Sequence, residues 1–191
     1  MRNLVYYVAV SLDGYIAGPG GEYDFYPHDP DMLSVINGET PEFVPTFVRE
    51  QVGMPVGEPN KRFDTVLMGR GSYEPGLAVG ATNPYAHLTQ YVVSSTLSQA
   101  DYPEVTIVDG DPLELVRKLK QDEGADIWLC GGGTLAAALL GEIDEMIIKS
   151  YPVVAGGGIS AFTGEFSPTL FVPTRRVEFG TGAQATWFRR A

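Results

Sequence analysis

The chain has 191 residues, of which 44% are hydrophobic and 19% are charged, and its formal net charge is −11. This composition predicts one folded domain over residues 1–191, because disordered chains combine few apolar residues with a high net charge. The acidic balance excludes a typical nucleic-acid-binding protein, since phosphate backbones are bound through Lys and Arg.

Neither a disulfide nor a membrane anchor is expected. Cys130 is the only cysteine, which excludes an intrachain disulfide and fits a reducing, cytoplasmic setting. The apolar part of the amino terminus is too short for a signal or membrane helix, so we expect no membrane partner. The two histidines, His28 and His87, are isolated, and we therefore expect no metal site.

Apolar, β-branched segments recur along the chain and predict strands. These segments are 4–10, 63–74 (running into a helix), 91–97, 104–112, 125–130, 145–154, 169–180 and 185–191. Where strands alternate with helices the sheet is mostly parallel, and the last two segments, joined by a Gly-containing turn, add an antiparallel pair. The fold class is therefore α/β, with a central sheet flanked by helices.

Besides the helix that begins within 63–74, three helices are expected between these strands. The first covers residues 41–52, with Thr40 as N-cap and Pro41 at the first helical position. The second follows Asp111 and Pro112 and ends before Gly124. The third follows three consecutive glycines, in the sequence GTLAAALLG.

The glycine triplet Gly131–Gly133 matches the pattern G-x-G-x-x-A between a strand and a helix. Without Cβ atoms, backbone N–H groups can approach a pyrophosphate at a helix N-terminus. A regular Rossmann domain is disfavoured, because the motif lies late in the chain and Tyr151 occupies the position about 20 residues on where an acidic residue belongs. A tight turn that binds no ligand remains the alternative.

Two further polar groups follow predicted parallel strands. Arg70 can bind a phosphate through its forked guanidinium, or it can form an ordinary ion pair with Glu74. The hydroxyls of Ser94, Ser95 and Thr96 can donate to phosphate oxygens, although such residues also end strands as turns. Because all these groups lie at one edge of one sheet, together they could hold the two separated phosphates of a dinucleotide that carries a 2′-phosphate.

The sequence resembles the dihydrofolate reductase superfamily, in particular the branch that includes the reductase domain of riboflavin biosynthesis. Five segments carry the resemblance, in the family's order over residues 4–162: VAVSLDGYIAG, DTVLMGRGSYE, YVVSSTL, DIWLCGGGTLAAALL and IIKSYPVVAGGGISAF. The resemblance implies a three-layer fold with an antiparallel C-terminal strand pair. It also implies a homodimer, in which the apolar tail packs across a two-fold axis.

The same resemblance implies a cofactor, NADPH, and the residues that bind it. Arg70, beside Gly69, would face the adenosine ribose phosphate together with Ser94, Ser95 and Thr96. The pyrophosphate would lie on Gly131, Gly132, Gly133, Thr134 and Leu135. The nicotinamide end would meet the backbone around Ala9, Ile16 and Ala17.

The implied activity is an NADPH-dependent reductase that passes hydride to a small heterocycle, either pterin-like or ribosylaminopyrimidine-like. Asp24 is the candidate substrate-facing acid, because the flanking Tyr23 and Phe25 could stack on a flat ring and raise its pKa by desolvation. The alternatives are a solvated loop carboxylate at Asp24 and, as a rival acid, Asp13, which reads first as a turn residue. A nucleotide-binding module without turnover is the second functional hypothesis.

Two other features have structural interpretations. Lys149 lies within an apolar strand, where we expect its side chain to point outward. The second glycine triplet, 156–158, is expected to form an irregular turn that returns the chain to the sheet.

Overall fold

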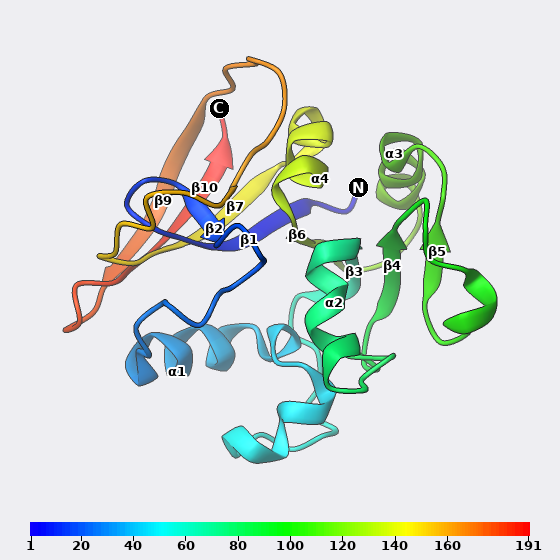
Figure 1. Cartoon of the computed structure of the whole chain (residues 1–191), viewed down its shortest axis with the longest axis horizontal. Coiled ribbons are helices and arrows are strands. Elements are labelled where there is room, and N and C mark those ends of the chain that lie inside the picture. Colours follow the sequence, from blue (N-terminus) through cyan, green and yellow to red (C-terminus); the bar gives the residue numbers. More distant parts are fainter.

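An eight-stranded sheet runs through the centre of the computed structural model, which describes residues 1–191 (Figure 1). Its order is β5-β4-β3-β6-β1-β7-β10-β9. The strands are β1 (Leu4–Val10), β3 (Phe63–Gly69), β4 (Thr89–Val93), β5 (Thr106–Val108), β6 (Asp126–Gly131), β7 (Glu145–Ser150), β9 (Phe171–Glu178) and β10 (Gln184–Arg190). All strands from β5 to β7 in this order are parallel, whereas β10 is antiparallel to both β7 and β9. The predicted sheet and its antiparallel C-terminal pair are confirmed.

A second, smaller sheet pairs β2 (Tyr15–Ala17) with β8 (Ile159–Ser160) in antiparallel fashion. It joins the loop after β1 to the loop after β7. The glycine triplet 156–158 lies just before β8 in an irregular stretch, as its turn-forming sequence predicted.

Four α-helices cover the large sheet: α1 (Pro30–Glu39), α2 (Arg70–Ala78), α3 (Pro112–Gln121) and α4 (Gly133–Ala138). Alternate residues of β1 point to opposite faces, as the pleat of a strand requires. Val5 packs in one apolar cluster with Met32 of α1 and Tyr73 of α2. Leu4 packs in the other with Val116 of α3 and with α4. The molecule therefore has three layers, with the sheet between two pairs of helices (Figure 1). None of the helices combines the length and apolar character needed to cross a lipid bilayer.

The helix predicted after Asp111 is confirmed, because its sequence carries local start signals. The Asp111 carboxylate accepts a hydrogen bond from the backbone N–H of Leu113 at 2.8 Å, and Pro112 occupies the first turn. Helix α1 begins in the same way, with Asp29 as N-cap and Pro30 next. It was not predicted, since residues 23–40 have no clear apolar periodicity.

The helix predicted over residues 41–52 is wrong. Three short 3₁₀ turns occupy this segment, η1 (Pro41–Phe43), η2 (Thr46–Val48) and η3 (Glu50–Val52). Pro45 interrupts the helical pattern, because a residue that precedes proline is pushed out of the α region. Val44 accordingly has an extended backbone, with φ −86° and ψ 118°.

Two buried charges organise residues 40–62 in place of a helix. Oε1 of Glu42 accepts hydrogen bonds from the backbone N–H groups of Lys61, Arg62 and Phe63. The Arg49 guanidinium donates to backbone carbonyls of this segment: those of Pro41, Val44, Val56 and Glu58. Hydrogen bonds from these two side chains to the backbone therefore fix the conformation of the segment. It packs on the same face of the sheet as α1.

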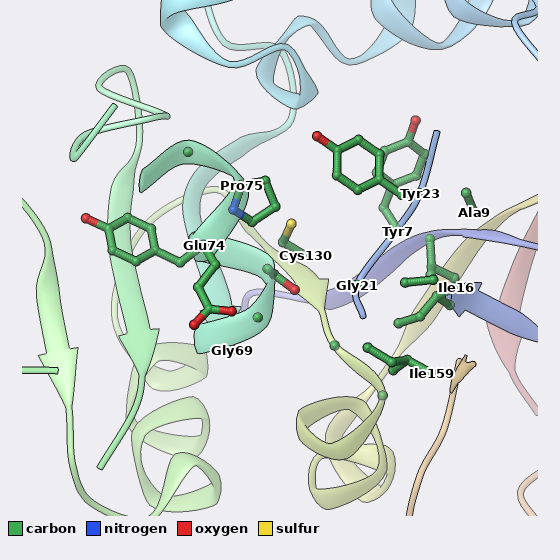
Figure 2. A pocket seen from close by; sticks show the side chains of 18 of the residues that line it. Tyr7, Ala9, Ile16, Gly21, Tyr23, Gly69, Glu74, Pro75, Cys130 and Ile159 are labelled. Carbon is green, nitrogen blue, oxygen red and sulfur yellow. The ribbon is translucent and has the colours of Figure 1, made fainter. Parts of the chain in front are cut away.

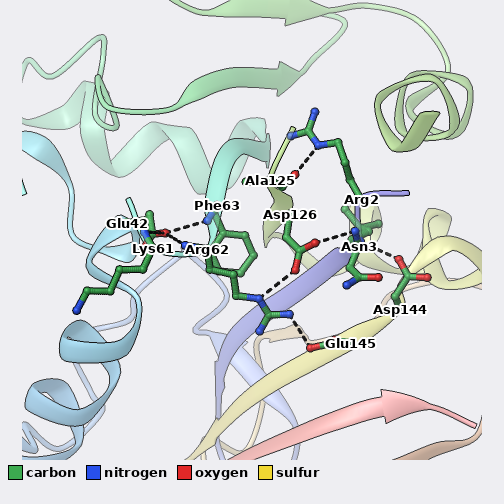
Figure 3. A network of polar contacts seen from close by, with 11 residues as sticks. Arg2, Asn3, Glu42, Lys61, Arg62, Phe63, Ala125, Asp126, Asp144 and Glu145 are labelled. Atoms are coloured by element: carbon green, nitrogen blue, oxygen red, sulfur yellow. Dashed lines mark hydrogen bonds and ion pairs between the residues drawn. The ribbon is translucent and has the colours of Figure 1, made fainter. Parts of the chain in front are cut away.

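The amino ends of the central strands are tied by a polar network (Figure 3). Arg62, which precedes β3, forms ion pairs with Asp126 of β6 at 3.1 Å and with Glu145 of β7 at 2.7 Å. Asp126 also accepts a hydrogen bond from the backbone N–H of Asn3. These bonds hold the strands together at their amino ends. They use none of the polar groups at the carboxyl ends of the strands.

We predict that Glu42→Ala lowers the free energy of unfolding by about 2–5 kcal/mol, because the buried carboxylate is lost and three backbone N–H groups, that of the buried Phe63 among them, lose their acceptor. Urea or guanidinium denaturation measures the change. Glu39→Ala is the matched control, since Glu39 forms an exposed ion pair with Arg175 that should contribute less than about 1 kcal/mol. Equal losses in the two variants would show that the Glu42 bonds do not hold this segment.

Candidate nucleotide-binding site

A cavity of about 1370 Å³ runs along the carboxyl ends of the central strands, from the face that α1 and α2 cover to the start of α4. Tyr7 of β1, Cys130 of β6 and Lys149 of β7 line it from the sheet, and α1, α2 and the loop after β1 line it from the other sides. Figure 2 shows side chains from β1, β6, α2 and the loop after β1 around one space, with Cys130 between Tyr7 and Pro75. The volume exceeds the roughly 300–1,000 Å³ of a typical small-molecule site, so the cavity has room for more than one small ligand.

The direction in which successive strands are added to the sheet reverses between β3 and β6, next to this cavity. Strand β3 leads through α2 to β4 on one side, whereas the neighbouring strand β6 leads through α4 past β1 to β7 on the other side. In open α/β sheets, a reversal of this kind leaves a crevice outside the carboxyl ends of the two strands, where ligands bind. The glycine triplet and Arg70 border this crevice.

Two glycines allow the elements to approach at the crevice. A Cβ atom on Gly69, at the end of β3, would lie 3.3 Å from the carbonyl oxygen of Gly131 and 3.3 Å from the nitrogen of Gly132. A Cβ atom on Gly133 would lie 2.0 Å from the carbonyl oxygen of Ser160. The third glycine of the triplet is therefore required by packing, while Gly132 lines the cavity.

The helices that border the crevice begin differently from the other two. The starts of α1 and α3 are capped by aspartates, whereas α2 and α4 begin after Gly69 and Gly132 and have no side-chain cap. Their first-turn N–H groups thus lack the carboxylate that an N-cap residue supplies. Both uncapped helix starts lie at the carboxyl ends of the neighbouring strands β3 and β6. The positive ends of the two helix dipoles favour an anion there.

Arg70 connects the cavity to a second hollow of about 470 Å³, which Ser94, Ser95 and Thr96 line. Its guanidinium donates to Oγ1 of Thr96 at 2.6 Å and forms an ion pair with Glu74 at 2.8 Å. The arginine and the hydroxyls that follow β4 are thus neighbours, and the alternative ion pair is present as well. Ser94 is buried and its Oγ accepts from the N–H groups of Thr96 and Leu97, as in an ordinary turn.

The predicted cofactor residues mostly line these two spaces. Ala9, Ile16, Ala17, Gly69, Arg70, Gly132, Gly133, Thr134 and Leu135 line the larger cavity, and Ser94, Ser95 and Thr96 line the hollow beside it. Gly131 is buried behind them at the end of β6. Residues from five separate segments of the sequence therefore come together at one edge of the sheet.

The other end of the cavity is an aromatic chamber, formed by Tyr7, Tyr26, Phe43, Trp128 and Tyr151. The rings of Tyr7 and Phe43 stack with centroids 3.9 Å apart and planes 6° apart. Those of Tyr26 and Tyr151 lie 4.8 Å apart. Sequence reasoning missed this chamber, because its members come from two strands, the turn η1 and two loops. A flat ring is the ligand shape that such walls favour.

The predicted acid, Asp24, is exposed and does not line the cavity. The desolvation on which that prediction depended is therefore absent, although Tyr23 next to it does line the cavity. The rival Asp13 accepts hydrogen bonds from Ser11 Oγ and from two backbone N–H groups of the 153–158 loop. These bonds, that of Ser11 first, lower the pKa of Asp13 to about 2, so its carboxyl is ionised at neutral pH and has no proton to donate.

Asp29 is the carboxylate that does line the chamber, and the sequence did not single it out. It is buried, and both its oxygens are engaged, one by the hydroxyl of Thr181 and the other by the N–H of Met32. These hydrogen bonds, that of Thr181 first, lower the pKa of Asp29. Asp29 is thus an ionised helix cap rather than a proton donor. No three His, Cys, Asp or Glu side chains group as a metal site would require.

The outward position predicted for Lys149 is wrong. Its side chain lines the chamber, with Nζ 4.7 Å from the centroid of the Tyr7 ring. The neighbours of Lys149 on the sheet are small, Ala9 on β1 and Ala185 on β10. The space above these alanines lets the lysine lie along the sheet face, a cross-strand effect that one strand's sequence cannot reveal.

The sheet order and the crevice at the β3–β6 reversal define an α/β fold of the dihydrofolate reductase type. The model of the RibD C-terminal domain family matches residues 2–184. The chain therefore belongs to the RibD C-terminal domain family.

Among curated relatives, the uncharacterized protein YwjB of Bacillus subtilis (strain 168) is 30% identical over 190 residues, which cover 98% of each chain. A structure from Shewanella sp. PV-4, provisionally named a riboflavin biosynthesis protein, is 25% identical to this chain. The two superpose with a TM-score of 0.73 over 100% of this chain and 99% of that chain.

Two more distant structures share the fold. A Thermotoga maritima diaminohydroxyphosphoribosylaminopyrimidine deaminase/5-amino-6-(5-phosphoribosylamino)uracil reductase is 16% identical, with a TM-score of 0.66 over 100% of this chain and 57% of that one. Dihydrofolate reductase from Enterococcus faecalis, complexed with NADP(H) and RAB-propyl, is 16% identical, with a TM-score of 0.64 over 98% of this chain and 96% of that chain. The predicted dihydrofolate reductase-like fold is confirmed.

We predict that Gly133→Ala lowers the free energy of unfolding by about 1–3 kcal/mol, because the new Cβ would overlap the carbonyl of Ser160 and force β8 away from α4. Chemical denaturation measures the loss. Gly141→Ala is the control, since a Cβ there meets nothing within 4 Å. A Gly133→Ala variant as stable as the control would contradict the close approach.

We also predict that Cys130 is unreactive in the folded protein. Burial raises the pKa of its thiol to about 12, so at pH 8 the thiolate fraction is roughly a thousandfold below that of an ordinary cysteine. Mass spectrometry of iodoacetamide-treated protein measures the rate, which should rise as the pH approaches 12. The same chain unfolded in guanidinium is the control, because it has no other cysteine, and equal rates in the two states would refute the prediction.

Proposed function

We propose that the protein is an NADPH-dependent reductase whose cofactor lies along the crevice and whose flat hydride acceptor lies in the aromatic chamber. The observation that carries this proposal is the meeting of two uncapped helix starts, after Gly69 and Gly132, beside Arg70 and Thr96. Such an arrangement suits a ligand with a pyrophosphate and a further, separate phosphate. The structure of Enterococcus faecalis dihydrofolate reductase, which has the same fold, is a complex with NADP(H).

The residues fit this cofactor in three places. The glycine start of α4, where Gly132 lines the cavity, leaves room for the backbone N–H groups of Thr134 and Leu135 to face a pyrophosphate. Arg70 would bind the 2′-phosphate, with the hydroxyls of Ser95 and Thr96 around it. The other end of the nucleotide would reach Ala9, Ile16 and Ala17, next to the chamber. NADPH would supply the hydride, and the protein would supply orientation and exclusion of water.

The aromatic chamber supports a small, flat heterocycle as the hydride acceptor, either pterin-like or ribosylaminopyrimidine-like. Its walls are tyrosine, phenylalanine and tryptophan rings, which stack on flat heterocycles. The family's RibD C-terminal domain name and the reductase named in the Thermotoga maritima structure favour the second type.

A nucleotide-binding module without turnover is the second candidate function. The observation that favours it is the lack of a poised acid, because Asp24 lies outside the cavity and Asp29 is an ionised cap. Oxidation of NADPH, followed at 340 nm with pterin, pyrimidine and riboflavin-precursor acceptors, separates the two candidates. Binding of NADPH without oxidation by any acceptor would favour the module.

We predict that Arg70→Ala weakens NADPH binding roughly tenfold to a hundredfold, as expected for the loss of a charge-assisted hydrogen bond, and changes NADH binding much less. Titration with quenching of tryptophan fluorescence measures both affinities. Arg117→Ala is the matched control, because Arg117 forms an exposed ion pair with Glu142 and does not line the cavity.

The comparison of the two nucleotides decides the assignment. Equal weakening of NADPH and NADH in Arg70→Ala would show that Arg70 does not bind the 2′-phosphate. A wild-type protein that binds neither nucleotide would refute the proposed function as a whole.

A further inference from the structure

Lys149 is a cation without an acidic partner in the aromatic chamber. The charged or basic side chains that line the cavity are His28, Asp29, Arg70, Glu74 and Lys149. Arg70 and Glu74 pair with each other, and Asp29 is held by Thr181 and Met32. Lys149 takes part in none of the ion pairs of the protein.

The surroundings of Lys149 keep it charged and in place. Its Nζ lies over the Tyr7 ring, a cation–π contact that does not require a carboxylate. Burial alone lowers the pKa of Lys149, but its contacts with Tyr7 and then Tyr151 raise the pKa above its ordinary value. The chamber therefore presents an ammonium group at neutral pH.

Another donor without an acceptor lies in the wall of the chamber. Trp128 is only 2% exposed, lines the cavity, and its indole N–H has no hydrogen-bond partner. Donors without acceptors in a buried site favour a ligand that brings its own acceptor atoms. A positively charged ring would instead meet an uncompensated ammonium, which is unfavourable at low dielectric.

We propose that Lys149 binds an anionic oxygen on a flat ring stacked in the aromatic chamber, so that the chamber selects planar anions over neutral or cationic rings of the same shape. The binding site stands on the geometry of Lys149 and its walls. The identification of this ring as the hydride acceptor rests on the proposed function.

Calorimetric titration with a matched pair of probes tests the site without any nucleotide. Orotate is a flat pyrimidine with a carboxylate, and orotamide is its neutral amide of nearly the same shape. We expect wild-type protein to bind orotate roughly tenfold to a hundredfold more tightly than orotamide, and Lys149→Met to lose this preference. Lys149→Arg should keep most of it, and Lys118→Met, a change of an exposed lysine on α3, should keep all of it.

The outcomes are separable. Orotate binding that is absent in the wild type, or equal in wild type and Lys149→Met, overturns the inference. So does a parallel loss of orotate and orotamide in Lys149→Met, which would indicate lost packing only. If Lys149→Met fails to fold, the wild-type preference decides, and a ratio near one overturns the inference. NADPH titration of the same samples tests the proposed function separately, because its failure leaves the orotate result unchanged.

Discussion

The close approach of β3 and β6 at their carboxyl ends is the constraint on which the rest of the structure depends. Met68 pairs with Gly131, and a side chain on Gly69 would press against the backbone of the glycine triplet. Because the two strands approach this closely, α2 and α4 start next to each other and leave toward opposite sides of the sheet. The crevice, its two uncapped helix starts and the cavity below them follow from this one approach.

The two edges of the sheet have opposite electrostatic character. At the amino edge, Arg62 and its carboxylate partners satisfy one another, so this edge stabilises the strand alignment and has little left to bind. At the carboxyl edge, the helix starts lack side-chain caps and the nearest cation, Arg70, has only exposed partners. The protein has a net charge of −11, yet the positions that favour an anion gather at this one place. Local hydrogen-bond donors, rather than the overall charge, determine where an anion can bind.

The cavity divides into a polar half and an aromatic half with different origins. The polar half is made by strand ends and helix starts, which any sheet of this topology places together. The aromatic half is made by the sheet face, by two loops that carry Tyr26 and Tyr151, and by Phe43 of residues 40–62. This last segment is shaped by the buried Glu42 and Arg49 rather than by regular helix. The topology of the sheet accounts for the first half, whereas individual side chains, Lys149 among them, form the second.

The sequence by itself determined the strands of the large sheet, the helix after Asp111, the antiparallel tail and the grouping of Arg70, the hydroxyls and the glycines at one edge. These depend on local signals: caps, apolar runs, turn residues and the rule that parallel strands end on the same side. Only the tertiary structure decided the rest. It showed that Asp24 lies outside the cavity and that Lys149 lies over Tyr7 in an aromatic chamber. Contacts of this kind join residues far apart in the chain, and their geometry is set by packing that no single segment encodes.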